Sequence, residues 1–109
     1  MRKGGPQEGL QRNVSNAFDA AMRRLGDLHP ATGSFEEKIN YWHSVCGFSD
    51  AALGDLHILR VWRNSSDHHD RERWRRDGPR SAEEASAVLG RVEAVVGAHE
   101  GTSRDRLCG

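Results

Sequence analysis

The stretch of sequence that decides the fold is Leu56–His68, which reads LHILRVWRNSSDH. Its apolar residues recur three and four positions apart, which predicts an amphipathic helix that ends near Arg63 and Asn64. The side chains of residues 64–67 compete with a helical backbone for hydrogen bonds, so we expect a turn there. Such a turn would let Arg63 and His68 point at one anionic group. Arginine brings a fixed charge and a planar fork of donors, and histidine can act as an acid or base near neutral pH.

Two helices are predicted upstream of this stretch. Apolar residues fall at helical spacing in Gln7–Leu28, and the helix should end just before Pro30, because the residue before a proline is pushed out of the α region. Ser34–Glu37 has the pattern of a capping box and should begin the second helix. Gly47 should end it, since glycine adopts the left-handed conformation without steric cost. Ser49 is then expected to cap the third helix, which contains the deciding stretch.

A fourth helix is predicted near the C-terminal end. Ser81–Glu84 is a second capping box, and apolar residues recur at helical spacing from Ala85 to Val96. Residues 70–80, which precede it, are highly charged and close with Gly78 and Pro79. No segment shows the alternation of a strand. Four helices with short connections predict an all-α fold, an antiparallel up-and-down four-helix bundle.

Length and composition indicate one small domain. The chain has 109 residues, and we expect a flexible leader at 1–6, a single helical-bundle domain at 7–100 and a disordered tail at 101–109. The hydrophobic fraction is only 36%, so a partner subunit is expected to supply part of the apolar surface. No run approaches the ~20 apolar residues of a membrane span. Cys46 and Cys108 form no CxxC pair and no metal-ligand spacing, which favours a reducing compartment and a cytoplasmic location.

The charge is unevenly distributed, although the formal net charge is zero. Zero net charge argues against a protein that coats nucleic acid in general. Seven arginines and four acidic residues between Arg60 and Arg80 give a balance of +3, whereas one arginine and four glutamates between Ser81 and Glu100 give −3. The positive segment fits a phosphate-bearing ligand. Alternatively, the two segments neutralise each other.

The motif RNSSDH at Arg63–His68, preceded by an apolar helix, resembles the HEPN superfamily (higher eukaryotes and prokaryotes nucleotide-binding domains). The resemblance spans residues 7–100 as an order of helices. It implies a small helical bundle, and many members are RNases that carry an arginine, a polar residue, a short spacer and a histidine. It further implies a homodimer with two facing motifs, RNA cleavage without a metal or other cofactor, and a role in toxin–antitoxin or defence modules with an antitoxin-like protein partner. Asp67 departs from the small or apolar residue that members often carry.

The resemblance also implies roles for individual residues. His68 would move the proton of the ribose 2′-hydroxyl or of the leaving oxygen. Arg63 would hold the phosphate and offset its charge in the transition state, and Asn64 would orient one of the two. Arg60 and Arg73 would also contact RNA. Apart from the resemblance, the run RERWRR at Arg71–Arg76 places Trp74 among four arginines, so Trp74 would offer a surface on which a base stacks while the arginines bind phosphates. Alternatively, Trp74 covers the end of the bundle.

Other interpretations of the same residues stay open. The run at residues 67–70, Asp-His-His-Asp, contains four metal-ligand types, but adjacent side chains diverge, so no metal is predicted. Trp62 lies one position off the inward stripe of its helix, which favours a dimer contact. Asp67 would orient the histidine or repel an RNA phosphate. Repulsion would favour the competing function, a non-catalytic helical interaction module of a larger complex.

Overall fold

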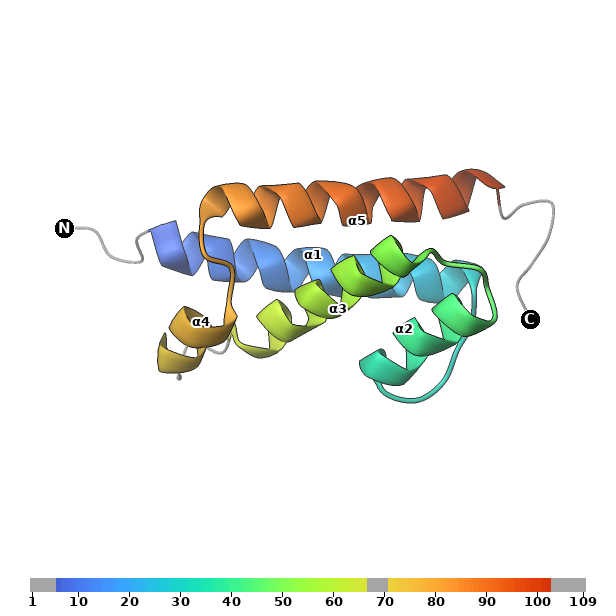
Figure 1. The fold of residues 1–109 in the computed structure, drawn as a ribbon, viewed down its shortest axis with the longest axis horizontal. Helices are drawn as coiled ribbons and strands as arrows, with labels where there is room; N and C mark the ends of the chain where they lie inside the picture. Colours follow the sequence, from blue (N-terminus) through green and yellow to red (C-terminus); the bar gives the residue numbers. More distant parts are fainter. Residues whose placement is uncertain (1–5, 67–70, 103–109) are drawn as a thin grey trace.

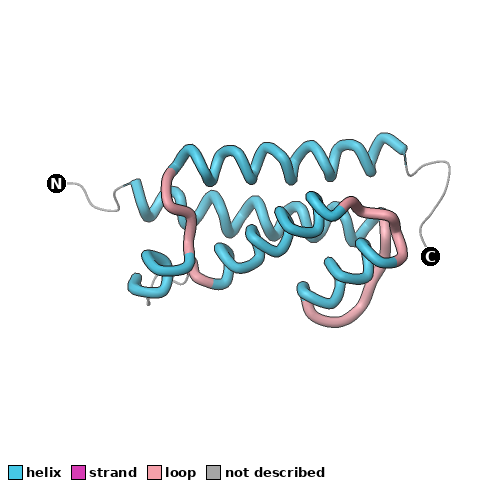
Figure 2. The backbone as a smooth tube through the Cα atoms, viewed as in Figure 1, coloured by secondary structure: helices cyan, strands magenta, loops and turns pink. Residues whose placement is uncertain are grey.

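Five α-helices make up the described part of the protein (Figure 1). The computed structural model describes residues 6–66 and 71–102, and no strand occurs within them, so the all-α prediction is confirmed (Figure 2). A short helix lies in the charged segment for which the sequence predicts none, so the predicted number of four helices is too low. The five helices are α1 (Pro6–Leu28), α2 (Phe35–Ser44), α3 (Asp50–Asn64), α4 (Arg71–Asp77) and α5 (Ala82–Thr102).

The predicted caps determine where α2 and α3 begin. The Ser34 hydroxyl accepts from the backbone N–H of Glu37, and the Glu37 carboxylate accepts from the backbone N–H of Ser34, which completes the predicted capping box. Gly47 follows α2 with φ of 79°, as expected of a glycine after a helix end. The Ser49 hydroxyl accepts from the backbone N–H of Ala52 and begins α3.

The second predicted capping box, before α5, forms only in part. The Ser81 hydroxyl accepts from the backbone N–H of Glu84 at 3.0 Å. The Glu84 carboxylate accepts from the backbone N–H of Arg80 at 2.7 Å, not from that of Ser81. Glu84 in the first turn of α5 therefore still accepts from the backbone before the helix. Its partner is the N–H of Arg80, one residue before the Ser81 N–H that a capping box uses.

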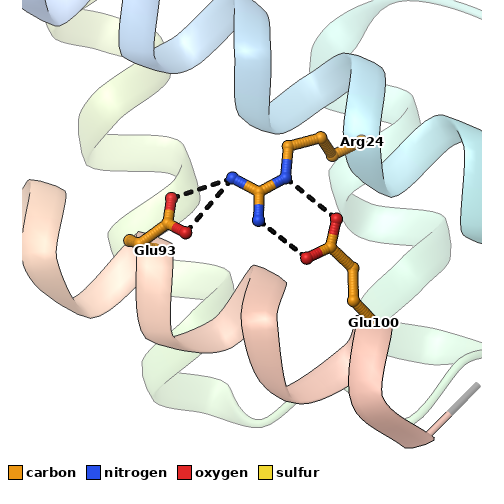
Figure 3. Close-up of polar contacts among 3 residues, drawn as sticks. All are labelled: Arg24, Glu93 and Glu100. Atoms are coloured by element: carbon orange, nitrogen blue, oxygen red, sulfur yellow. Dashed lines mark hydrogen bonds and ion pairs between the residues drawn. The ribbon is translucent and has the colours of Figure 1, made fainter.

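The order of helix directions differs from the predicted antiparallel up-and-down bundle. α1 and α5 lie side by side and run in the same direction (Figure 1), and Arg24 near the end of α1 binds Glu93 and Glu100 of α5 (Figure 3). The cause lies in the connection between α1 and α2, which doubles back along the molecule. Phe35 at the start of α2 therefore packs edge-on against Phe18 in the middle of α1, with 5.1 Å between ring centroids.

The core is made by apolar residues from all five helices, with α3 at its centre. α3 packs against α1, α2, α4 and α5, so its buried face is wider than one stripe. This is why Trp62, predicted to be an exposed dimer contact, is instead only 5% exposed, and that prediction is wrong. No helix among residues 6–66 and 71–102 has the length and apolarity needed to span a membrane. The large side chains that are fully buried include Phe18, Leu25, Ile39, Trp42, Leu56 and Leu59.

The state of one cysteine also differs from the expectation. Cys46 is half-buried just after α2 and takes part in a disulfide. The spacing of the two cysteines in the sequence shows no framework of bridges and therefore favours reduced thiols. Cys108 lies outside the described residues. The cytoplasmic location therefore stays a prediction.

Candidate functional site

An open cleft of about 410 Å³ lies where the C-terminal end of α3 meets α1 and α4. Among residues 6–66 and 71–102, those that line it all carry polar side chains, and we call it the Arg63 cleft. Three residues singled out from the sequence, Arg63, Asn64 and Arg73, come together here. Two guanidinium groups with neutral donors around them form a surface that can bind an anion. The lining residues are Ser15 of α1, Arg63, Asn64 and Ser66 at the end of α3, and Arg73 of α4.

Arg63 is held from two sides at the end of α3. Its guanidinium carbon lies 5.8 Å from the centroid of the Phe35 ring, and its Nε lies 3.3 Å from Oδ1 of Asp19. The contact with Asp19 is an ion pair without an aligned hydrogen bond, because Nε has no hydrogen-bond partner within the described part of the chain. The side chain is 37% exposed. Arg63 is thus positioned by its neighbours and still retains donors for a ligand.

The turn predicted after Asn64 is stabilised by two serines. The Ser65 hydroxyl donates to the carbonyl of Trp62 at 2.9 Å, and the Ser66 hydroxyl donates to the carbonyl of Arg63 at 2.6 Å. Both carbonyls belong to the last turn of α3, and they also accept from the backbone N–H groups of Ser65 and Ser66. Ser65 is fully buried, while Ser66 lines the cleft. Both short side chains therefore stabilise the end of α3, and Ser66 also forms part of the cleft wall.

Arg60 does not line the cleft. Its Nε donates to Nδ1 of His57 at 3.2 Å, and Nε2 of His57 lies 2.9 Å from Oδ1 of Asn40. Burial lowers the pKa of His57, the charge of Arg60 lowers it further, and the charge of Glu36 acts in the opposite direction. Arg60 therefore belongs to a polar contact between α2 and α3. Its predicted role in RNA binding has no support from its position.

Trp74 is only 5% exposed, so its ring faces are not open to a base. It is the one large apolar side chain of α4, whose other residues are charged, and it turns toward the core while the arginines stay at the surface. The alternative in which Trp74 covers the end of the bundle agrees with this burial. The alternative in which a base stacks on Trp74 does not agree with this burial.

The predicted catalytic histidine, His68, lies outside the described residues, as do Asp67, His69 and Asp70. Within residues 6–66 and 71–102, no three His, Cys, Asp or Glu residues form a group able to hold a metal ion. Of the predicted pair, the structure therefore describes Arg63 and not His68.

Sequence reasoning missed two residues of this region, Ser15 and Asp19 of α1. Ser15 has no motif around it, and Asp19 lies between the apolar positions of its helix, where a solvated face is expected. Both reach the site because α1 packs against α3. A pattern within either helix carries no information about that pairing, so only the tertiary structure reveals them.

Comparisons of the chain with protein-family models, curated proteins and solved structures gave no significant match. The HEPN resemblance therefore rests on the motif and the helix order alone. The chemistry of the Arg63 cleft is the structural feature that bears on function.

Proposed function

We propose that this protein is an HEPN-like RNA-binding domain whose Arg63 cleft holds the phosphate backbone of single-stranded RNA. The observation that carries the proposal is the convergence of Arg63, Asn64 and Arg73 on one cleft. Arg63 and Asn64 belong to the motif, whereas Arg73 comes from a separate helix. The packing of α4 against α3 brings Arg73 next to the two motif residues.

The chemistry of the lining suits a phosphodiester. Guanidinium groups bind phosphate oxygens in a planar, two-point manner. The hydroxyls of Ser15 and Ser66 and the amide of Asn64 add neutral donors of the kind that position a nucleic-acid backbone without reading its sequence. The cleft is open to solvent, so its donors are accessible to a ligand.

We further propose that the domain cleaves RNA as a metal-independent endoribonuclease. In this proposal His68, two positions beyond the cleft residue Ser66, exchanges the proton of the reacting hydroxyl or of the leaving oxygen. Arg63 offsets the charge of the phosphate in the transition state. The four longer helices would correspond to the helical bundle of a cytoplasmic HEPN domain that acts as a homodimer, with an antitoxin-like protein as its partner.

The competing proposal is a non-catalytic helical interaction module. It is favoured by Ile58 and Val61, which are 41% and 40% exposed on the outer face of α3. Exposed apolar side chains one helical turn apart form a surface that a partner protein can cover. This module would need neither Arg63 nor His68. Substitution of either residue would therefore impair RNA binding or cleavage but leave the function of an interaction module unchanged.

The binding proposal is tested with fluorescent single-stranded RNA and a pair of arginine variants. Arg63→Gln should weaken binding roughly tenfold, as expected when a charge-assisted contact is lost. It should also reduce the slope of log K against log salt by about 0.7, the value for one phosphate contact on a single strand. Arg60→Gln is the matched control, because this arginine lies one turn away and points to His57. Equal effects of the two substitutions would contradict the proposal.

A further inference from the structure

The outer face of α3 carries a row of exposed small and apolar residues, which we call the α3 stripe. Its members are Ala51, Gly54, Ile58 and Val61, separated by three, four and three positions. This spacing places them on one side of the helix, in the pattern of a helix–helix contact. Ile58 and Val61 are 41% and 40% exposed, although both are apolar. The α3 stripe is therefore a surface that another helix can cover.

The two halves of the α3 stripe differ in size. Ala51 and Gly54 are small, whereas Ile58 and Val61 are large and branched. A Cβ at Gly54 would meet nothing within 4 Å in the described part of the chain, so the helix surface has room there. In an antiparallel pair of α3 helices, each Ile58 lies over the other copy's Gly54, and each Val61 over its Ala51. A parallel pair would instead set large residues on large ones and leave gaps between the small ones.

The charges beside the α3 stripe also suit an antiparallel pair. Asp50 begins α3, and Arg60 lies near its end. Hydrogen bonds direct both residues toward α2, so they lie on the same flank of the stripe. When Gly54 lies opposite Ile58 of a second copy, Asp50 comes within one helical turn of that copy's Arg60. A parallel pair would bring like charges together, so the charges favour the antiparallel orientation.

We propose that the α3 stripe binds the α3 stripe of a second copy in antiparallel orientation. The inference rests on the homodimer of the proposed function and specifies its interface and orientation. The two-fold axis would pass near Leu56, about seven residues from Arg63, so the two Arg63 clefts would lie roughly 21 Å apart along the helix axes. Each cleft then binds its ligand alone, in contrast to the facing motifs that the HEPN resemblance implies.

Exchange of the large and the small residue tests the interface. Gly54→Ile fills the space for the other copy's Ile58, so it should raise the Kd of the dimer in sedimentation equilibrium at least roughly tenfold. The double variant Gly54→Ile/Ile58→Ala swaps the large and small positions and should bring the Kd back to within about threefold of wild type. Gly90→Ile is the matched control, because Gly90 is an exposed glycine of α5 whose Cβ would also meet nothing. Its Kd should stay unchanged.

Exchange of the two charges tests the orientation independently. Asp50→Arg and Arg60→Asp should each raise the Kd by roughly threefold or more, since each places like charges together twice in the dimer. The double variant Asp50→Arg/Arg60→Asp should restore it, because the opposite charges meet again. Tighter association of Gly54→Ile would indicate a parallel pair that gains from a filled gap, and it would overturn the inference. Failure of both double variants to restore the dimer would also overturn it.

RNA binding distinguishes failure of this inference from failure of the proposed function. Monomeric Gly54→Ile should bind single-stranded RNA as tightly per chain as wild type does, because each Arg63 cleft is complete within one copy. If both exchanges behave as expected but wild type binds no RNA, the RNA function is wrong and the antiparallel dimer stands. If RNA binding is lost together with the dimer, the clefts act jointly and the inference is overturned. A wild type that stays monomeric at high micromolar concentration leaves the α3 stripe to a different protein and overturns it as well.

Discussion

The imidazole rings of His29 and His99 meet at the ends of α1 and α5, with 3.2 Å between Nε2 of His29 and Nδ1 of His99. One ring donates and the other accepts, so the contact requires at least one neutral imidazole. Burial lowers the pKa of both, and the charge of His29 lowers the pKa of His99 further. His29 is only 4% exposed, and its Nδ1 has no hydrogen-bond partner among the residues described.

Acid should therefore destabilise the fold through this pair. The native state favours neutral rings, whereas histidines of the unfolded chain bind protons below their ordinary pKa of about 6.5. The contribution of this pair to the free energy of unfolding is fully present above that value. It is lost as the pH falls from about 6.5 through the lowered pKa values of the native state. Thermal melts between about pH 7.5 and pH 5.5 should show a smaller acid-induced loss of Tm in His99→Gln than in wild type. An equally steep loss in both proteins would rule out the pair as its source.

The ion pairs made by Arg91 and by Arg24, which all involve α5, should differ in their response to salt. Arg91 of α5 donates to both oxygens of Asp55 on α3, at 2.9 and 3.1 Å, and the Asp55 side chain is only 11% exposed. Arg24 binds Glu93 and Glu100, which are more exposed, and its hydrogen bonds lower the pKa of Glu100 (Figure 3).

Arg91→Met should lower Tm more than Arg24→Met, because it leaves a nearly buried carboxylate without its partner. The loss from Arg24→Met should shrink in high salt, since solvated pairs are screened. Calorimetry of both variants at low and high salt checks the order. A larger or salt-independent loss for Arg24→Met would show that the Arg24 contacts matter more than their exposure indicates.

The sequence was most informative where the cause of structure is local. The caps at Ser34 and Ser49 and the end of α1 before Pro30 depend on a few neighbouring residues, and the structure confirms them. The directions of α1 and α5 depend on how a connection doubles back, and no local pattern encodes that. α4 was missed because a segment with four arginines and one tryptophan shows no helical stripe.

The residues of the candidate site also fall into those that a local sequence pattern reveals and those that only the packing of helices reveals. Arg63 and Asn64 were found because they lie in one continuous motif, and Arg73 because it belongs to a local run of positive charge. Ser15 and Asp19 reach the region only through helix packing. Two alternatives stay open for Trp74 at the level of sequence, base stacking and cover for the end of the bundle, because charge around an aromatic residue has the same pattern whether the ring points outward or inward. The burial of Trp74 agrees with the second alternative.

Two glycines should respond in opposite ways to alanine. A Cβ at Gly78 would lie 2.6 Å from the carbonyl oxygen of Trp74 and 3.0 Å from its ring, so Gly78→Ala should destabilise by about 1–3 kcal/mol. Nothing lies within 4 Å of a Cβ at Gly90 in α5, so Gly90→Ala should stabilise by about 0.5–1 kcal/mol. Chemical denaturation measures both. A stable Gly78→Ala protein would mean that α4 shifts without cost.

Self-association should depend on Ile58 and Val61 rather than on Trp62. Both lie on the outer face of α3 and are about two-fifths exposed, whereas Trp62 is buried. If the protein is the proposed homodimer with α3 at its interface, the double variant Ile58→Glu/Val61→Glu should be monomeric, because charges there cannot be desolvated cheaply. Val45→Glu, which changes an exposed residue beyond the end of α2, is the control. Light scattering that shows only monomer for wild type at high micromolar concentration would exclude the dimer.

Cleavage, if the endoribonuclease proposal is correct, should depend on His68 and Arg63 and on no metal. Activity on mixed single-stranded RNA should survive EDTA and should vary with pH through the histidine range of about 6–7. His68→Ala should abolish it. Arg63→Lys should impair it strongly, because lysine keeps the charge and loses the planar fork of donors.

His69→Ala is the internal control for that experiment, because adjacent side chains leave the backbone in different directions, so it should retain most of the activity. Equal losses in His68→Ala and His69→Ala, or loss of activity in EDTA, would instead favour a metal site at residues 67–70, Asp-His-His-Asp. If the protein binds RNA through Arg63 but never cuts it, the RNA-binding proposal stands and the endoribonuclease proposal is wrong. If the protein neither binds nor cuts RNA, the result supports the interaction module, whose surface is the exposed face of α3.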